Sequence, residues 1–453
     1  MRHLYVMRHA KAKQPSGDMT DRQRPLRKWG KRQAGAMARV LQGWHALEGA
    51  IYVSTAARTR ETFDAVAAQL PKRTLADQVH FEEALYIFDS DALLEWLKAL
   101  PDKAERVLII GHNPALPDLA RWLSKEAPYS LSTGSVLHFI LPDTSWSAME
   151  RGCAELVGSL IPEEASYPLF KRLAPPPPEY HEDMARRIGD MLEYQCRIVR
   201  ALEHGVIAGF DAEFLHQYRV NLRRSRAVGE SLLSVAKVSG LKKMLKRLKL
   251  LGQATSDLRD LDVFLKYQST SPPPLSARAH QGLKQWLQGC QQAQHKALGQ
   301  QLSTPEYAEQ LQSWQTFIAS DEFKEALSKI TPKRINKVLD KRISRQNEDL
   351  AALSLGSPDT ALHELRKRVK RIRYLADLDS NTPTDFLSTL KHRQNLLGEY
   401  QDLCTRQTWL EAFIESLDSD AEQEQECSAW HTSLEASKQA LHKDALGLEP
   451  LAS

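Results

Sequence analysis

The amino-acid sequence predicts an α/β domain followed by an all-helical domain built from two related halves. Strand-like runs alternate with helix-like segments up to about residue 145, and four consecutive prolines follow at 175–178. From about residue 182 onward, β-branched runs disappear and heptad-like apolar spacing dominates. A chain of 453 residues also exceeds what one hydrophobic core usually organises. We therefore predict a three-layer α/β domain followed by an all-α, duplicated helical bundle.

The first region alternates the two kinds of element in a regular order. Such alternation indicates a largely parallel sheet with helices on both faces, which we place at residues 1–160. The strand-like runs are 4–7, 51–54, 107–110 and 136–141, and the helix-like segments are 29–42, 58–70, 92–100 and 116–124.

The prolines separate the regions. Four in succession form a stiff, extended spacer that a helix cannot cross, so residues 161–180 are predicted to be a proline-rich linker. A second interruption at 272–274 divides the helical region, residues 181–445, into halves at about 181–271 and 275–445. Each half contains one copy of a basic segment.

The two basic segments repeat one charge pattern 147 residues apart. Cations at helical spacing line one face of a helix, and an apolar stripe beside them would seat each helix on a core. A solvated charged face is the ordinary interpretation of one such helix, but a matched second copy favours a site for a long polyanion. The positions i, i+3, i+7 and i+10 are His216, Arg219, Arg223 and Arg226 in the first copy, and His363, Arg366, Lys370 and Arg373 in the second.

Three short motifs in the first region follow strand-like runs. Arg8-His9-Ala10 comes after the first run, residues 54–59 with Arg58 come after the second, and Gly111-His112-Asn113-Pro114 comes after a later one. Ligands of open α/β sheets bind at the carboxyl ends of the strands, so the motifs can converge on one pocket. Two histidines and two arginines at helix N-termini suit a phosphate group.

This set of motifs resembles the histidine phosphatase superfamily, specifically its short, SixA-like branch, across residues 1–160. Arg24-Pro25-Leu26 followed by Gly30 belongs to the same resemblance. The resemblance implies that His9 attacks phosphorus and carries the phosphoryl group, while Arg8, Arg58 and His112 hold its oxygens. No metal and no other cofactor is expected, because fixed positive charge takes that role.

A proton donor for the leaving group is the weak point of this site. Glu82 and Glu83 are the nearest candidates, but neither lies in a recognisable motif. An alkoxide leaving from a phosphate ester needs a proton far more than the imidazole of phosphohistidine or the phosphate of polyphosphate does. The pocket is therefore predicted to favour P–N or phosphoanhydride bonds.

The helical region resembles the CHAD family, the conserved histidine α-helical domain, across about residues 181–440. The resemblance rests on the two His-led segments, on 245–249 and 390–393, and on Leu-Gly steps at 251–252 and 397–398. It implies binding of inorganic polyphosphate. Nucleic acid is the rival ligand, but the basic faces hold few aromatic side chains on which bases could stack. The candidate binding residues are His216, Arg219, Arg223, Arg224, Arg226, Lys246, Lys249, His363, Arg366, Lys367, Lys370, Arg373 and Lys391.

Together the two resemblances imply a metal-independent phosphohydrolase tethered to inorganic polyphosphate. A polyphosphate-binding scaffold with little or no phosphatase activity and a polyphosphatase that cuts the bound polymer are the alternatives. A phosphohistidine protein is a further candidate partner, nucleic acid is less favoured, and no membrane partner is expected. Five scattered cysteines without a Cys-x-x-Cys pair fit reduced thiols, so we expect a cytoplasmic protein, with polyphosphate granules as a candidate location.

Overall fold

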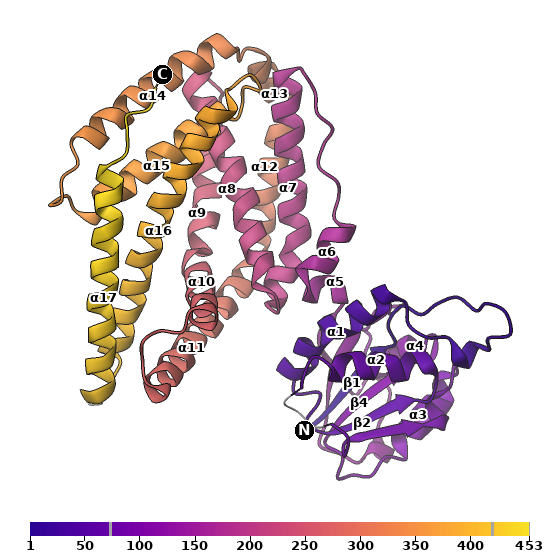
Figure 1. Cartoon of the computed structure of the whole chain (residues 1–453). Helices are drawn as coiled ribbons and strands as arrows, with labels where there is room; N and C mark the ends of the chain where they lie inside the picture. Colours follow the sequence, from indigo (N-terminus) through magenta and orange to yellow (C-terminus); the bar gives the residue numbers. More distant parts are fainter. Residues whose placement is uncertain (72–74, 418–420, 453) are drawn as a thin grey trace. The chain divides into compact units, whose positions relative to one another are not determined.

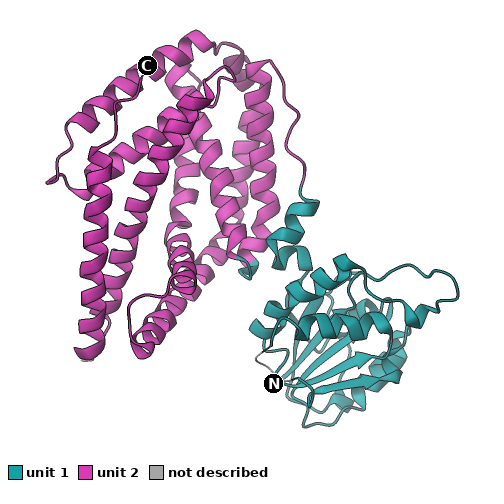
Figure 2. Ribbon diagram, viewed as in Figure 1, with its two compact units in different colours: residues 1–174, 208–211 teal, residues 175–207, 212–453 magenta. Residues whose placement is uncertain are grey.

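Residues 1–71, 75–417 and 421–452 are described by a computed structural model, and they belong to two units (Figures 1 and 2). Unit 1 contains Met1–Ala174 together with the short segment Ala208–Asp211. Unit 2 contains Pro175–Ile207 and the chain from Ala212 onward.

In the described part of unit 1, a six-stranded sheet has the order β3-β2-β4-β1-β5-β6. β3, β2, β4 and β1 run parallel, whereas β5 and β6 are antiparallel to their neighbours. The four predicted strands are confirmed, but β3 and β6 were missed because both lie at sheet edges, where few side chains are buried. The strands are β1 (Arg2–Arg8), β2 (Ala50–Ser54), β3 (Val79–Glu82), β4 (Arg106–Gly111), β5 (Val136–Leu141) and β6 (Glu155–Leu160).

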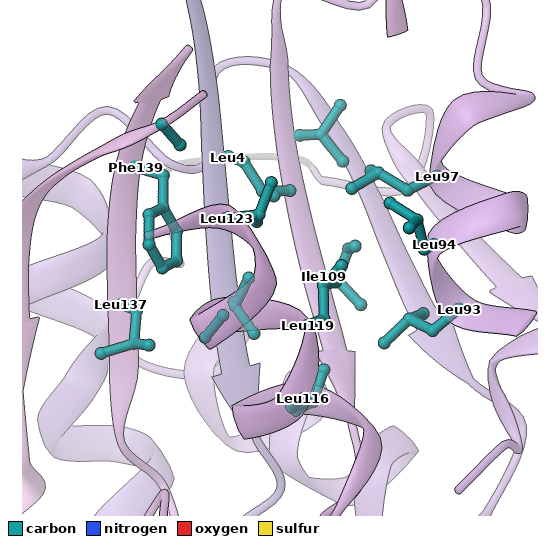
Figure 3. Packing of buried hydrophobic residues seen from close by; sticks show 14 of the residues in the cluster. Leu4, Leu93, Leu94, Leu97, Ile109, Leu116, Leu119, Leu123, Leu137 and Phe139 are labelled. Carbon is teal, nitrogen blue, oxygen red and sulfur yellow. The ribbon is translucent and has the colours of Figure 1, made fainter. Parts of the chain in front are cut away.

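Helices cover both faces of this sheet, which confirms the predicted three-layer fold. Side chains alternate along each strand, so Leu4 and Val6 pack on the face that carries α3 (Ser90–Lys98) and α4 (Ala115–Leu123) (Figure 3). Tyr5 and Met7 pack on the opposite face with α1 (Lys28–Gly43) and α2 (Ala57–Ala67). The buried strands β1 and β4 therefore hold their carboxyl ends in fixed positions.

The segment that joins the units is less uniform than the sequence suggested. Two short helices, α5 (Pro162–Ala165) and α6 (Tyr167–Leu173), lie inside residues 161–180, the range for which a proline-rich linker was predicted. Each carries a proline in its first turn, where the missing N–H costs no helical hydrogen bond. Residues 174–183, which include the four prolines, form neither helix nor strand.

Unit 2 is all-helical, as predicted. The two basic segments lie on α8 and α15, which pack against each other, and α14 packs against both. The predicted apolar stripes are buried: Leu222 on α8 and Val369 on α15 are at most 3% exposed. The helices are α7 (Met184–Ala208), α8 (Ala212–Val235), α9 (Leu241–Ala254), α10 (Ser256–Thr270), α11 (Ala277–Leu302), α12 (Pro305–Ala319), α13 (Asp321–Ser328), α14 (Pro332–Ala351), α15 (Asp359–Ala376), α16 (Thr384–Glu415) and α17 (Ala421–Leu446).

Gly30 marks a close approach that the fold of unit 1 requires. The backbone of Lys11 crosses α1 at this glycine, and a Cβ at position 30 would lie 2.2 Å from the Lys11 carbonyl oxygen. We expect Gly30→Ala to destabilise unit 1 by about 1–3 kcal/mol, because backbone rather than a flexible side chain would have to move. Hydrogen exchange of the β1 amides measures this loss of stability, because it reports the free energy of opening of unit 1 by itself.

Gly35 in the same helix is the matched control. A Cβ there would meet the flexible side chain of Gln69 at 3.5 Å. Gly35→Ala should therefore be neutral or stabilising by up to about 1 kcal/mol, from helix propensity alone. Equal loss of protection in both variants would show that the crossing at Gly30 is unimportant.

Candidate functional site

The parallel strands of unit 1 bring the predicted catalytic residues together. His9 follows β1, Arg58 lies in the first turn of α2 after β2, and His112 follows β4. β1, β2 and β4 are parallel neighbours, so these residues share one edge of the sheet. The His9 and His112 rings are 5.3 Å apart, and Arg58 Nε donates to His9 Nε2 at 3.2 Å. Arg8, at the end of β1, uses Nη1 to bond the Leu131 carbonyl at 2.6 Å.

His9 is held in the form that a nucleophile needs. Its Nδ1 lies 2.8 Å from the Ala10 carbonyl oxygen, which can only accept, so Nδ1 carries the proton and Nε2 keeps its lone pair. Burial lowers the pKa of His9 to about 3, and the Arg58 and Arg8 charges act in the same direction. The imidazole is therefore neutral at physiological pH.

His112 supplies a second neutral ring beside the first. Its Nε2 lies 2.8 Å from Ser54 Oγ, and burial followed by the Arg58 charge lowers its pKa to about 3. Within the described ranges, His112 Nδ1 and Arg8 Nε are buried atoms without a hydrogen-bond partner. Unpaired buried polar atoms are costly, so these two positions are suited to receiving the oxygens of an anion.

Asp21 organises this site, although the sequence analysis did not identify it. Its carbonyl and one carboxylate oxygen accept from Arg58 Nη1 and Nη2 at 2.6 and 2.9 Å. Tyr86 Oη and Arg24 Nη1 donate to the same carboxylate at 2.9 and 2.7 Å. Burial alone would raise the pKa of Asp21, but bonds from Arg24 and Tyr86 and the Arg58 charge lower it to about 2. In the sequence, the one pointer to Asp21 is that it lies three residues before Arg24, which belongs to a recognised motif.

The two proton-donor candidates lie near the end of β3. Glu83 is exposed, and its carboxylate accepts both Nη groups of Arg22 and the hydroxyl of Thr55, the latter at 2.8 Å. The hydrogen bond from Thr55, followed by Arg22, lowers the pKa of Glu83 despite the small opposing effect of desolvation. Glu82 is half-buried and pairs in register with Ser54. Glu83 is therefore ionised near neutral pH and has no proton to give.

The second candidate site is a cleft of about 1150 Å³ in unit 2, here called the basic cleft. Its walls come from α8, α9, α14 and α15. Among the described lining residues, Glu230 is the one acidic side chain. The cationic lining consists of Arg223, Arg226, Lys249, Arg334, Lys337, Lys341, Arg342, Arg345, Arg366, Lys367, Arg368, Lys370 and Arg371, with His363 beside them.

Only part of the predicted cationic set lines this cleft. Arg219 instead points into the bundle, where its Nη1 donates to the Gly252 carbonyl at 3.0 Å and burial lowers its pKa to about 10. Arg224 and Arg373 line a smaller, separate pocket. His216, Lys246 and Lys391 are absent from the described lining. The predicted residues in the cleft are Arg223, Arg226, Lys249, His363, Arg366, Lys367 and Lys370.

The wall formed by α14 was missed entirely. It contributes Arg334, Lys337, Lys341, Arg342 and Arg345. Positions 334, 337, 341 and 345 have the spacing i, i+3, i+7 and i+11, which indicates one helix face. This spacing is visible in the sequence, but α14 lacks the leading histidine that marks the basic segments of α8 and α15.

Cations outnumber acids in the cleft, although Arg226, Arg345, Lys367 and Arg368 are paired with Glu230, Glu348, Glu364 and Asp349. Burial, followed by the Arg366 and Arg223 charges, lowers the pKa of Lys370 to about 7, although Asp402 opposes the shift. Burial raises the pKa of Asp260 to about 6, so this nearby carboxylate compensates the cations incompletely. A bound polyanion would relieve the repulsion among these cations, so the charge of the cleft is suited to extended negative charge.

Comparisons with known proteins match a part of each unit to a family. The histidine phosphatase superfamily (branch 1) matches residues 4–85, and the CHAD domain matches residues 190–411. An uncharacterized protein of Mycobacterium leprae is 30% identical over 172 residues, covering 34% of this chain and 99% of the relative. An uncharacterized protein of Mycobacterium tuberculosis is 28% identical over 165 residues, covering 34% and 99%.

Two solved structures are similar to parts of this chain. SixA from Nakamurella multipartitia is 28% identical, covers 35% of this chain and 95% of its own, and has a TM-score of 0.30. The CHAD domain of the plant Ricinus communis is 20% identical, covers 61% and 97%, and has a TM-score of 0.50, which supports the fold of unit 2.

The fold and the family matches therefore define a phosphatase-like α/β unit joined to an all-helical CHAD domain. The chain belongs to the histidine phosphatase superfamily through its N-terminal region and carries a CHAD domain after it. None of the described helices is both long and apolar enough to cross a membrane.

The lowered pKa values of His9 and His112 predict how the site responds to acid. Both rings should stay neutral in the folded protein down to about pH 4, whereas unfolded histidines titrate near pH 6.5. The unfolded state then binds more protons between these limits, so these two residues lower the free energy of unfolding as pH falls from about 6.5 toward 3. Nitrogen-15 NMR of labelled imidazoles checks this directly, with the urea-unfolded chain as control. A His9 signal that titrates between pH 5.5 and 7 would contradict the geometry.

Proposed function

We propose that this protein is a phosphohydrolase that forms a phosphohistidine intermediate on His9 and is held on inorganic polyphosphate by the basic cleft. The supporting observation is the 3.2 Å contact between Arg58 Nε and His9 Nε2. It places a permanent cation on the nitrogen that would attack, in a ring whose pKa burial lowers to about 3. A neutral imidazole facing fixed positive charge suits nucleophilic attack on a phosphoryl group.

The chemistry would proceed in two displacements. As the substrate enters, Arg58 Nε moves its hydrogen bond from His9 Nε2 to a phosphoryl oxygen. The freed Nε2 lone pair then forms a bond to phosphorus while the bond from phosphorus to the leaving group breaks. Arg8 Nε and His112 Nδ1, both without partners in the described structure, and Arg58 Nε would hold the phosphoryl oxygens as charge spreads over them. Water then attacks phosphorus, its proton passes to solvent, and inorganic phosphate leaves with the bond to His9 broken.

The substrate class follows from the acids around the pocket. Glu83 is ionised and fully engaged with Arg22 and Thr55, so it would not protonate a leaving alkoxide. Asp21, whose pKa is about 2, is also unable to donate at neutral pH. The site is therefore proposed to act on phosphohistidine or phosphoanhydride bonds, whose leaving groups depend less on a proton donor.

Two other functions stay open to the same experiments. A polyphosphate-binding scaffold with little turnover would keep the basic cleft and lack phosphate release. A polyphosphatase would release phosphate from the polymer itself. The intact arrangement of Arg8, His9, Arg58 and His112 favours an enzyme over a scaffold.

His9→Asn tests the nucleophile. The side chain is similar in size and polar, but it cannot carry a phosphoryl group, so turnover of a phosphohistidine peptide should fall by at least about a thousandfold. Radiolabel trapped on the wild-type protein should vanish, and affinity for long polyphosphate should stay within twofold. The assay also includes polyphosphate and a phosphate ester as substrates. Label that persists in the variant would rule out His9.

The double substitution Lys337→Gln/Lys341→Gln tests the α14 wall of the basic cleft. Each lysine that contacts a phosphate adds to counterion release, so the slope of log affinity against log salt should fall by about two. Affinity for long polyphosphate should drop about tenfold or more at 0.15 M salt, measured by fluorescence anisotropy. Lys246→Gln/Lys391→Gln removes the same charge from outside the cleft and should change affinity less than twofold. If both pairs weakened binding equally, net charge rather than the cleft would bind the polymer.

Competition between polyphosphate and single-stranded DNA at one salt concentration separates the two candidate polymers. Preferential binding of DNA would overturn the proposed ligand.

A further inference from the structure

A smaller pocket lies beside the same pair of central helices as the basic cleft. Its volume is about 250 Å³, and α7, α8 and α15 provide most of its walls. We call it the repeat pocket. Its lining consists of Arg187, Ile188, Met191, Gln195, Arg224, Val228, Arg373, Tyr374, Asp377 and Leu378.

The sequence repeat relates this pocket to the basic cleft. Shifting by 147 residues maps eight of these ten lining residues onto residues that line the cleft. Under the same shift α7 becomes α14, and α8 and α15 exchange places. The two cavities are therefore the two copies of one duplicated surface. Charges kept in both copies are Arg187 with Arg334, Arg224 with Arg371, Arg373 with Arg226, and Asp377 with Glu230.

The two copies have diverged in the side chains that decide what can bind. Where the basic cleft has Arg342, the repeat pocket has Gln195, and Lys341 and Arg345 correspond to Tyr194 and Ile198. At two other positions the repeat pocket has the larger side chain: Tyr374 and Leu378 correspond to Ala227 and Ser231 of the cleft. The repeat pocket thus has fewer cations and larger apolar side chains than the basic cleft.

Two arginines in the repeat pocket can receive an anion. Arg224 is exposed, and its charge acts on the Asp377 carboxylate together with that of Arg373. Arg373 Nε is buried without a partner in the described ranges, while its Nη1 forms an ion pair with Asp377 Oδ2 at 3.9 Å. Arg187, by contrast, is committed to the His181 and Leu378 carbonyls.

Apart from the arginines, Asp377 and Gln195, the pocket is lined by apolar and aromatic side chains. Met191, Val228 and Leu378 contribute hydrocarbon, and Tyr374 contributes a ring that is 8% exposed. A cavity of about 250 Å³ is below the usual range for drug-sized ligands, about 300–1,000 Å³, and suits a molecule with one ring. A long phosphate chain would leave this apolar surface uncompensated.

We propose that the repeat pocket is a separate binding site for a small organic anion, with the anionic group between Arg224 and Arg373 and a ring-sized apolar body against Met191, Val228 and Leu378. The inference goes beyond the proposed function, because it assigns a different ligand to the second copy of the duplicated surface.

Fluorine NMR with 4-fluorophenylphosphonate tests this site on the full-length protein, because a carbon–phosphorus bond resists hydrolysis at His9. Arg224→Gln/Arg373→Gln should weaken phosphonate binding at least tenfold and change affinity for long polyphosphate less than twofold. Arg371→Gln/Arg226→Gln alters the corresponding positions of the basic cleft. This variant should weaken binding of long polyphosphate at least tenfold and change phosphonate affinity less than twofold. Inorganic phosphate and 4-fluorobenzyl alcohol, which carry the head or the body alone, should each bind at least tenfold more weakly.

Met191→Glu provides a second variant that keeps both arginines. Met191 is 38% exposed, so this change should leave folding intact while its carboxylate repels the phosphonate and weakens binding at least tenfold. If neither Arg224→Gln/Arg373→Gln nor Met191→Glu reduced the affinity for the phosphonate, the proposal would be overturned. Inhibition of phosphohistidine turnover reports phosphonate binding at His9 separately. If the wild-type protein bound the phosphonate but not long polyphosphate, the proposed function would be contradicted and the repeat-pocket proposal would stand.

Discussion

Positive charge held in place without enough nearby acid is the constraint on which both units depend. In unit 1, Arg8 and Arg58 lie beside two buried imidazoles, and the rings tolerate this only because they are neutral. In unit 2, the cations of the basic cleft depress the pKa of Lys370. Like charges destabilise the empty protein, and an anion that enters removes that cost. The proposed affinity for phosphate would therefore come from the relief of repulsion among cations that the fold holds in place.

Asp21 shows how unit 1 tolerates this charge. It pairs with Arg58 and Arg24, and Tyr86 donates to the same carboxylate. These contacts fix the guanidinium of Arg58 so that Nε, rather than a flexible Nη, faces His9. A side chain outside the recognisable motifs thus orients one inside them.

Duplication explains the organisation of unit 2. Two copies of α7–α8 and α14–α15 create two equivalent surfaces, and only one of them kept a dense set of cations among the described residues. A polymer needs many weak contacts at once, so the loss of a few cations removes a copy from polymer binding. The repeat pocket carries Tyr374 and Leu378 where the basic cleft has the smaller Ala227 and Ser231.

The sequence by itself determined the class of each unit and which predicted residues lie around His9. Buried strands alternate reliably, and parallel strands end at one edge, so Arg8, Arg58 and His112 had to converge. It did not determine Asp21, because a loop residue has no periodicity and its contacts lie across the fold. Nor could it sort the cations of unit 2, since helical spacing identifies a face but not its neighbour. Packing decided that Arg219 points into the bundle, that Arg224 and Arg373 face a second pocket, and that α14 completes the cleft.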